Sequence, residues 1–132
     1  MKQFSVRTTS QFEMIDITNQ VKSVLREGSV KSGICYVFVP HTTAAVTINE
    51  NADPSVPRDI IMELDKVIPL HDNYRHMEGN SAAHIKSSLI GSSEAVFIED
   101  GQLILGTWQS LFFCEFDGPR TRKFYVKLIP AT

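Results

Sequence analysis

The 132-residue sequence predicts a single α+β domain, residues 1–132, built on a largely antiparallel sheet or half-barrel with three short helices. Strand-like segments lie at both ends of the chain, and helical patterns lie between them. Gly, Pro, Asn and Asp divide the chain into short elements, with no linker or low-complexity stretch. A hydrophobic share of 42% at this length supports one core, and the chain is too short for two domains.

The N-terminal part of the chain alternates predicted strands with one helix. Alternating apolar residues over 4–8 and 12–17 predict a β-hairpin. A Thr-Asn pair can cap a helix over 18–28, where apolar residues recur at helical spacing until a glycine. The continuous apolar run 33–39 predicts a strand buried on both faces, with 44–48 as its neighbour across a short connection.

The middle of the chain carries two helical patterns separated by a polar loop. Asp53 and Pro54 open the first helix, whose apolar stripe runs to Pro69. Residues 70–81 form a loop that is unusually rich in histidine. A shorter helix follows over residues 82–90 and is stopped by the next glycine.

The C-terminal third is predicted to consist of strands. Residues 94–98 and 103–105 flank an Asp-Gly turn, which is typical of a β-hairpin. Segments 108–116 and 123–129 are predicted to pair around the turn 117–119. So many strands leave edges that must be covered, which favours oligomerisation.

Charge and composition exclude several classes of function. The net charge of −2 argues against a nucleic-acid or membrane-surface binder, which would need a basic excess. No apolar run approaches the ~20 residues that a membrane-spanning helix needs. The first ten residues lack the apolar core of a signal peptide, so a cytoplasmic location is expected.

The two cysteines are expected to be structural. Cys35 and Cys114 each lie inside an apolar run, and neither belongs to a CxxC pair. This spacing gives no support to a zinc-finger or thioredoxin reading. Both thiols are therefore predicted to behave as small, buried apolar residues.

The first candidate motif is the segment 40–44, which follows an apolar strand. It places His41, Thr42 and Thr43 at the rim of the sheet, where functional residues often lie. The two hydroxyls can bind an oxyanion, or they can satisfy loose backbone groups at the strand end. We favour the functional interpretation, because histidine is a poor choice for a simple cap.

The second motif lies at a strand-to-helix junction. Glu50 and Asp53 are two carboxylates with the amides of Asn49 and Asn51 beside them. Carboxylates at this spacing can hold Mg²⁺ or act as acid and base. Asp53 directly before Pro54 is also an ideal helix N-cap, so we interpret it as structural and keep Asn49 and Glu50 as substrate-binding candidates.

The third motif gathers three of the four histidines within fourteen positions: His71, His76 and His84. Two or three imidazoles with Glu78 can form a transition-metal site with an open position, or serve as catalytic groups. The spacing matches no standard metal motif, and a histidine-rich loop can also be a solvated surface. His84 and Ser88 share one helix face, and His71 is the least favoured candidate.

Two C-terminal clusters complete the candidates. Trp108 and Gln109 can stack on a flat ring and hydrogen-bond to it, but for the tryptophan we favour a core position with its indole N–H satisfied. Arg120 lies in the one basic cluster of the chain, which suits a phosphate group. A charged hairpin tip is the commoner explanation for these cations, and salt bridges to Glu115 and Asp117 would be sufficient to pair them.

Taken in order, these blocks resemble the YjbQ family over nearly the whole chain. The matching blocks are Pro40-His41-Thr42-Thr43-Ala44, Asn49-Glu50-Asn51-Ala52-Asp53-Pro54, His76 with Glu78-Gly79-Asn80, Ala83-His84-Ile85-Lys86-Ser87-Ser88, Gly106-Thr107-Trp108-Gln109 and Glu115-Phe116-Asp117-Gly118-Pro119-Arg120. Six blocks in order are specific for the family and leave its function open. His71 matches none of them.

The resemblance implies a homotrimer with a pocket near His41, His76 and His84, between subunits. It also implies a secondary thiamine-phosphate synthase activity. In that reaction, hydroxymethylpyrimidine diphosphate is joined to a thiazole phosphate with release of pyrophosphate.

Two classes of function follow. In an enzyme, His41, His76, His84 and Glu78 would be catalytic, and the three histidines would bind a divalent metal, zinc or Mg²⁺. The residues expected to contact the substrate are Thr42, Thr43, Asn49, Glu50, Lys86, Ser87, Gln109 and Arg120. A metal-assisted hydrolase would use much the same set. In a binding module, a trimer would capture a small phosphorylated molecule without transforming it.

Overall fold

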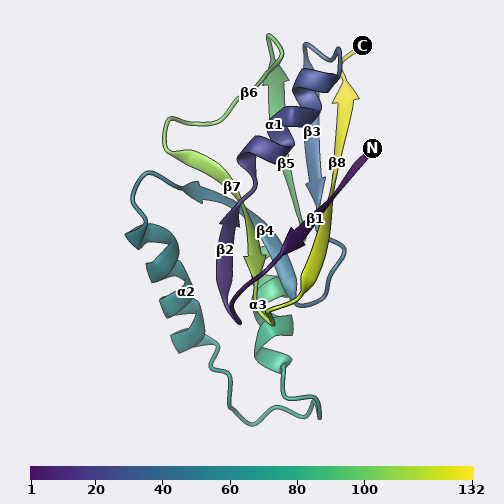
Figure 1. Ribbon diagram of the computed structural model, residues 1–132. Coiled ribbons are helices and arrows are strands. Elements are labelled where there is room, and N and C mark those ends of the chain that lie inside the picture. The colour runs from purple at the N-terminus through teal and green to yellow at the C-terminus, as the bar shows by residue number, and fades with distance from the viewer.

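Two antiparallel sheets form the framework of the molecule (Figure 1). The computed structural model describes residues 1–132. The five-stranded sheet has the order β1-β8-β3-β5-β6, and the three-stranded sheet has the order β2-β7-β4. The strands are β1 (Lys2–Arg7), β2 (Glu13–Asp16), β3 (Gly33–Phe38), β4 (Ala44–Glu50), β5 (Ser93–Glu99), β6 (Gln102–Leu103), β7 (Gln109–Glu115) and β8 (Thr121–Pro130).

Three helices interrupt the strands, within two residues of the predicted positions. These are α1 (Thr18–Glu27) after β2, α2 (Ser55–Val67) after β4 and α3 (Ser81–Ile90) before β5. The predicted α+β fold with three short helices on curled antiparallel strands is confirmed. None of the helices has the length and apolar character needed to cross a membrane.

The main hydrophobic core fills the space between the two sheets, and α1 closes it with Val21 and Leu25. A smaller core lies on the other face of the three-stranded sheet, where Phe112 and Cys114 of β7 meet Ala83 of α3. Successive residues of β7 therefore enter opposite cores, as the period of a strand requires. The three-stranded sheet is consequently sandwiched between the five-stranded sheet and the helices α2 and α3.

Three predicted strand pairings are wrong. β1 pairs with β8 and β2 with β7, so the first two strands do not form a hairpin. β4 is not the neighbour of β3, because β3 lies between β8 and β5 while β4 pairs with β7. β7 and β8 also belong to different sheets. In each case the short connection crosses from one sheet to the other, which alternation of apolar residues cannot reveal.

The predicted hairpin at the Asp-Gly turn is confirmed, because β5 pairs with β6. Asp100 and Gly101 both have positive φ, 50° and 72°. That conformation matches the right-handed twist of the flanking strands and explains the choice of these two residues.

The strand β3 is buried on one face only, which corrects the expectation of two buried faces. Cys35 and Val37 point into the main core and have no exposed surface. Tyr36 and Phe38, on the opposite face, are 42% and 43% exposed. The continuous apolar run thus marks a sheet whose outer face is also apolar.

The two cysteines are structural, as predicted. Burial raises the pKa of Cys35 to about 11. Burial, followed by the nearby charge of Glu94, raises the pKa of Cys114 to about 12. Both thiols are unpaired and protonated at neutral pH, so neither is an activated nucleophile.

Candidate active site

A cleft of about 610 Å³ opens beside the first turn of α3, the loop before it and the segment that follows β7. We name it the histidine cleft. The polar residues that line it and carry the chemistry discussed below are His76, Glu78, Asn80, His84, Asp117 and Arg120. Most of them were predicted from the sequence, and they come from three separate segments of the chain.

The histidine cleft contains two imidazoles in contact. His76, from the loop, and His84, from α3, meet edge to face with ring centroids 5.4 Å apart. Nε2 of His76 lies 3.9 Å from Oε2 of Glu78. An imidazole ring carries both a hydrogen-bond donor and an acceptor, so this pair can hold a ligand or exchange protons with it.

Arg120 reaches the same cleft and is fixed by Asp117. Nη2 of Arg120 and Nδ2 of Asn80 both donate to Oδ2 of Asp117, at 3.1 and 2.9 Å. Nε of Arg120 donates to the carbonyl of Asp117 at 2.9 Å. Half of the Arg120 side chain remains exposed, which leaves donors for a ligand. Oδ1 of Asn80 is buried without a hydrogen-bond partner.

Sequence reasoning found Arg120 as a substrate-binding candidate but missed the roles of Asn80 and Asp117. Both lie in blocks of the family resemblance, which was the available signal. The salt bridge between Arg120 and Asp117 that the sequence predicts as their structural role is present. The contact between Asn80 and Asp117 joins residues 37 positions apart, so nothing local predicts it.

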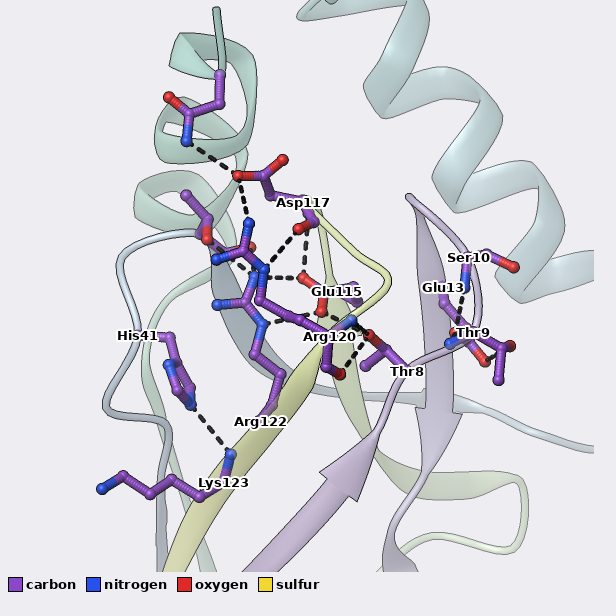
Figure 2. A network of polar contacts seen from close by, with 12 residues as sticks. Thr8, Thr9, Ser10, Glu13, His41, Glu115, Asp117, Arg120, Arg122 and Lys123 are labelled. Atoms are coloured by element: carbon purple, nitrogen blue, oxygen red, sulfur yellow. Dashed lines mark hydrogen bonds and ion pairs between the residues drawn. The ribbon is translucent and has the colours of Figure 1, made fainter. Parts of the chain in front are cut away.

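A buried ion pair between Glu115 and Arg122 supports the cleft (Figure 2). Nη2 of Arg122 also donates to Oγ1 of Thr43 at 2.8 Å, and Oγ1 of Thr8 donates to Oε1 of Glu115 at 2.8 Å. The N–H of Asp117 donates to Oε2 of Glu115 at 3.1 Å. Because Glu115 lies on β7 and Arg122 on β8, the pair joins the two sheets next to the cleft.

Acid is expected to weaken the fold through Glu115. Burial alone would raise the pKa of Glu115, but hydrogen bonds from Arg122, Asp117 and Thr8, with the Arg122 charge, outweigh burial and lower it. A lowered pKa stabilises the fold above the ordinary Glu pKa of about 4.3. This contribution is lost as the pH falls through the lower pKa of the folded state.

Thermal unfolding followed between pH 7 and pH 3 tests this expectation. The midpoint of the wild type should fall further over this range than the midpoint of Glu115→Gln, which has no carboxyl to protonate there. If the unfolding midpoints of the two proteins fall in parallel as the pH is lowered, Glu115 does not contribute to the acid sensitivity of the fold.

His41 lies beside the ion-pair network and does not line the histidine cleft. Its Nε2 accepts the N–H of Lys123 at 3.0 Å (Figure 2). Burial, then the charge of Arg122, lowers the pKa of His41 against the opposing effect of that hydrogen bond. His41 is therefore a neutral imidazole at pH 7, and its ring carries the proton on Nδ1.

A second cleft of about 350 Å³ adjoins the first. We name it the serine cleft after the residues that line it together with His41, namely Ser87, Ser88 and Ser92. His84 and Thr42 line both clefts. His84 is consequently the member of the predicted histidine set that connects His41 with His76.

Two of the predicted substrate-binding residues hold parts of the fold together, although Thr43 also lines the histidine cleft. The hydroxyl of Thr43 is already engaged by Arg122 and the side chain is buried. Lys86 is 1% exposed, and its Nζ bonds to Oδ1 of Asp65 at 3.1 Å. The same ammonium lies 4.1 Å from the ring centroid of Phe12. Lys86 thus ties α3 to α2 and lines neither cleft.

The candidates Asn49, Glu50 and Gln109 lie at the other end of the three-stranded sheet. Glu50 is opposite Gln109 in the strand register, whereas Ala44 at the start of β4 is opposite Glu115. Six residues of strand, about 20 Å, separate these two ends. Oδ1 of Asn49 accepts the N–H of Glu50, and Oε1 of Gln109 accepts the N–H of Gly106.

Two other sequence interpretations are settled by local contacts. Asp53 accepts both the N–H and the hydroxyl of Ser55, at 2.9 and 2.7 Å, so its contacts are structural. These hydrogen bonds lower the pKa of Asp53. The N-cap of α2 is Pro54, one residue later than predicted. Trp108 is exposed rather than part of the core.

The residues present do not form a complete metal site within one chain. No group of three or more His, Cys, Asp or Glu side chains is arranged to hold a metal ion. His41 uses one ring nitrogen on the backbone of Lys123, and His76 and His84 supply only two nitrogens. Resident zinc or Mg²⁺ therefore stays a prediction that requires ligands from outside the chain.

The fold and the two clefts define a small α+β protein with an open, histidine-lined site. A family model described as "UPF0047 protein YjbQ-like" matches residues 2–131, and the chain belongs to this family. The expected family is thereby confirmed. The chain is 53% identical to the UPF0047 protein YugU of Bacillus subtilis, covering 98% of each chain. It is 56% identical to a UPF0047 protein of Methanocaldococcus jannaschii, covering 96% of this chain and 91% of the relative.

Solved structures agree with this assignment. A Clostridium acetobutylicum protein of the YjbQ/UPF0047 family is 56% identical, with a TM-score of 0.97 over 98% of this chain and 100% of that one. A Sulfolobus solfataricus protein, described as YbjQ-like and of unknown function, is 32% identical, with a TM-score of 0.95 over 98% and 96% of the two chains.

Proposed function

We propose that the protein is an enzyme that acts on a small phosphorylated molecule in the histidine cleft. The observation that carries this proposal is the contact of His76 with His84 in the cleft that Arg120 also lines. Arg120 can hold a phosphate oxygen while an imidazole gives or takes a proton. Asn80 supplies a buried acceptor that a ligand hydroxyl or amine can satisfy.

The charge balance of the cleft favours a phosphorylated ligand that arrives with a cation. With neutral imidazoles, the lining holds one cation, Arg120, and two carboxylates, Glu78 and Asp117. A bare diphosphate would meet repulsion there, whereas its Mg²⁺ complex would not, because carboxylate oxygens are ligands that Mg²⁺ prefers.

The reaction we propose is thiamine-phosphate formation. The bond between the methylene carbon of hydroxymethylpyrimidine diphosphate and its bridging oxygen breaks, and pyrophosphate leaves with the electron pair. The ring nitrogen of the thiazole phosphate forms the new bond to that carbon. Arg120 would hold the departing pyrophosphate, and His84 or His76 would supply a proton to it.

The test has a binding arm and a turnover arm. Pyrophosphate binding is measured by calorimetry with Mg²⁺ present, and pyrophosphate release is measured with both thiamine precursors. We expect Arg120→Ala to weaken pyrophosphate binding about tenfold or more, because it removes hydrogen bonds from a charged group. Arg58→Ala, which removes an exposed cation of α2 outside both clefts, is the matched control.

The outcomes separate the candidate functions. Release of pyrophosphate that depends on both precursors supports the synthase. Pyrophosphate binding without turnover would assign the chain to the non-catalytic binding modules. Release of inorganic phosphate from single phosphorylated compounds would indicate a hydrolase. No binding of pyrophosphate to the wild type would contradict the proposal as a whole.

Metal content is tested separately by elemental analysis of protein purified without added metal. One equivalent of zinc per subunit, lost when His76 and His84 are both replaced by alanine, would establish a resident ion. Its remaining ligands would then come from the substrate, water or a neighbouring copy. No metal in either protein would assign the two histidines to proton transfer and anion binding.

The homotrimer is part of the proposal. The outer face of the five-stranded sheet exposes Tyr36 and Phe38 of β3, Phe97 of β5 and Ile129 of β8. These side chains lie on neighbouring strands that share one face. An apolar surface of this kind on a small protein is expected to be covered by another chain. We assign it to contacts between copies.

Phe38→Glu is expected to dissociate this assembly, because a carboxylate would be buried without a partner in the interface. Light scattering after size-exclusion chromatography measures the mass. The wild type should have three times the mass of one chain, and the variant should have the mass of a single chain. Met62→Glu, on an exposed face of α2, should remain trimeric. A monomeric wild type would contradict the assignment.

A further inference from the structure

The serine cleft contains a polar group for which the chain offers no partner. Ser87 is 7% exposed, and its hydroxyl has no hydrogen bond in the structure. The residue lines the serine cleft. Buried hydroxyls normally have a partner, and a molecule that occupies the cleft would supply one here.

His41 supplies a second free group to the serine cleft. Its Nε2 accepts the N–H of Lys123, so the neutral ring carries its proton on Nδ1. That N–H has no hydrogen-bond partner within the chain. The cleft thus offers a hydroxyl and an N–H to a ligand.

The two clefts differ in charge. No Lys, Arg, Asp or Glu lines the serine cleft, whereas Arg120, Asp117 and Glu78 line the histidine cleft. The helix α3 adds to the difference. Its first turn lines the histidine cleft, and its last turn, which contains Ser87, lines the serine cleft. The carbonyl end of a helix disfavours an anion, so Ser87 is poorly placed to bind a phosphate.

We propose that the site accepts a two-part ligand that extends past His84. The phosphorylated end occupies the histidine cleft, and an uncharged ring with hydrogen-bonding groups occupies the serine cleft against Ser87 and His41. In the reaction proposed above, on which this inference rests, that ring is the aminopyrimidine. Thr42 and His84 line both clefts and therefore lie at the junction.

The experiment measures three probes separately by calorimetry: hydroxymethylpyrimidine, pyrophosphate with Mg²⁺, and hydroxymethylpyrimidine diphosphate with Mg²⁺. Ser87→Ala should weaken the binding of hydroxymethylpyrimidine and of its diphosphate about two- to tenfold, as expected for the loss of one hydrogen bond. The affinity for pyrophosphate should not change. Arg120→Ala should weaken the binding of pyrophosphate and of the diphosphate, and it should leave the affinity for hydroxymethylpyrimidine unchanged.

Ser23→Ala is the matched control, because Ser23 lies on α1 outside both clefts and its hydroxyl donates to the carbonyl of Gln20 at 2.6 Å. Stability gives an independent check on Ser87. Replacing an unpartnered buried hydroxyl by hydrogen should not lower the unfolding midpoint. A marked fall in the Ser87→Ala midpoint would mean that the hydroxyl is bonded within the protein and would overturn the inference.

Two binding results would also overturn it. In one, Ser87→Ala weakens the binding of pyrophosphate as much as the binding of hydroxymethylpyrimidine, which would place Ser87 in the phosphate site. In the other, the wild type does not bind hydroxymethylpyrimidine, or Ser87→Ala binds it with unchanged affinity. Failure of pyrophosphate to bind anywhere contradicts the proposed function instead, and the hydroxymethylpyrimidine arm still decides the role of the serine cleft.

Discussion

Replacing Glu115 with glutamine is expected to lower the free energy of unfolding by about 3–5 kcal/mol, the usual loss when one partner of a buried ion pair is removed. Glu115 has no exposed surface and Arg122 is 4% exposed. Glutamine keeps one acceptor oxygen but carries no charge, so the Arg122 guanidinium remains buried without a counter-charge and faces an NH₂ donor in place of the second oxygen. Urea unfolding at pH 7, followed by circular dichroism, measures the difference.

An exposed ion pair provides the control. Arg120→Ala breaks the bridge to Asp117 at the surface and should change the free energy of unfolding by less than about 1 kcal/mol. Replacing both buried partners, with Glu115→Leu and Arg122→Met together, should recover much of the loss, because no buried charge is left alone. If Glu115→Gln unfolds at the wild-type urea concentration, the pair does not hold the sheets together.

Replacing His84 with alanine is expected to lower the turnover number by about 10²- to 10⁴-fold, the range for a general acid or base. His84 contacts His76 and lines both clefts, so no other titratable side chain adjoins both parts of the proposed ligand. The measurement is pyrophosphate release with saturating precursors, under conditions where the wild type is active.

His71→Ala is the matched control, because His71 lies in the same segment of the chain but lines neither cleft. Its turnover number should stay within about twofold of the wild type, as expected for a surface substitution. Thermal unfolding of both variants checks that each is folded. Equal turnover by His84→Ala and the wild type would remove His84 from the mechanism and would leave Arg120 and the clefts as a binding site.

The helices could be predicted from the sequence because their signals are local. Helical spacing of apolar residues, Asp53 before Pro54, and the glycine after α3 each act within a few positions. The Asp100-Gly101 hairpin was predictable for the same reason, since the turn requires positive φ at both positions.

The strand partners could not be predicted in this way. β1 and β8 lie at opposite ends of the chain and pair along six positions. Each short connection from β1, β3 and β7 leads into the other sheet, and a hairpin would have produced the same apolar alternation. The prediction that β3 is buried on both faces failed for a related reason. An exposed apolar face gives the same sequence pattern as a buried one.

By itself, the sequence determined the family, the helices and the residue types of the candidate site, including His76, His84 and Arg120. The tertiary structure alone decided which of the candidates meet. It placed Lys86 between helices and left the Ser87 hydroxyl without a partner. The reason is physical: a helix or turn is specified by neighbours in the chain, whereas burial and side-chain partners depend on segments brought together only when the sheets pack.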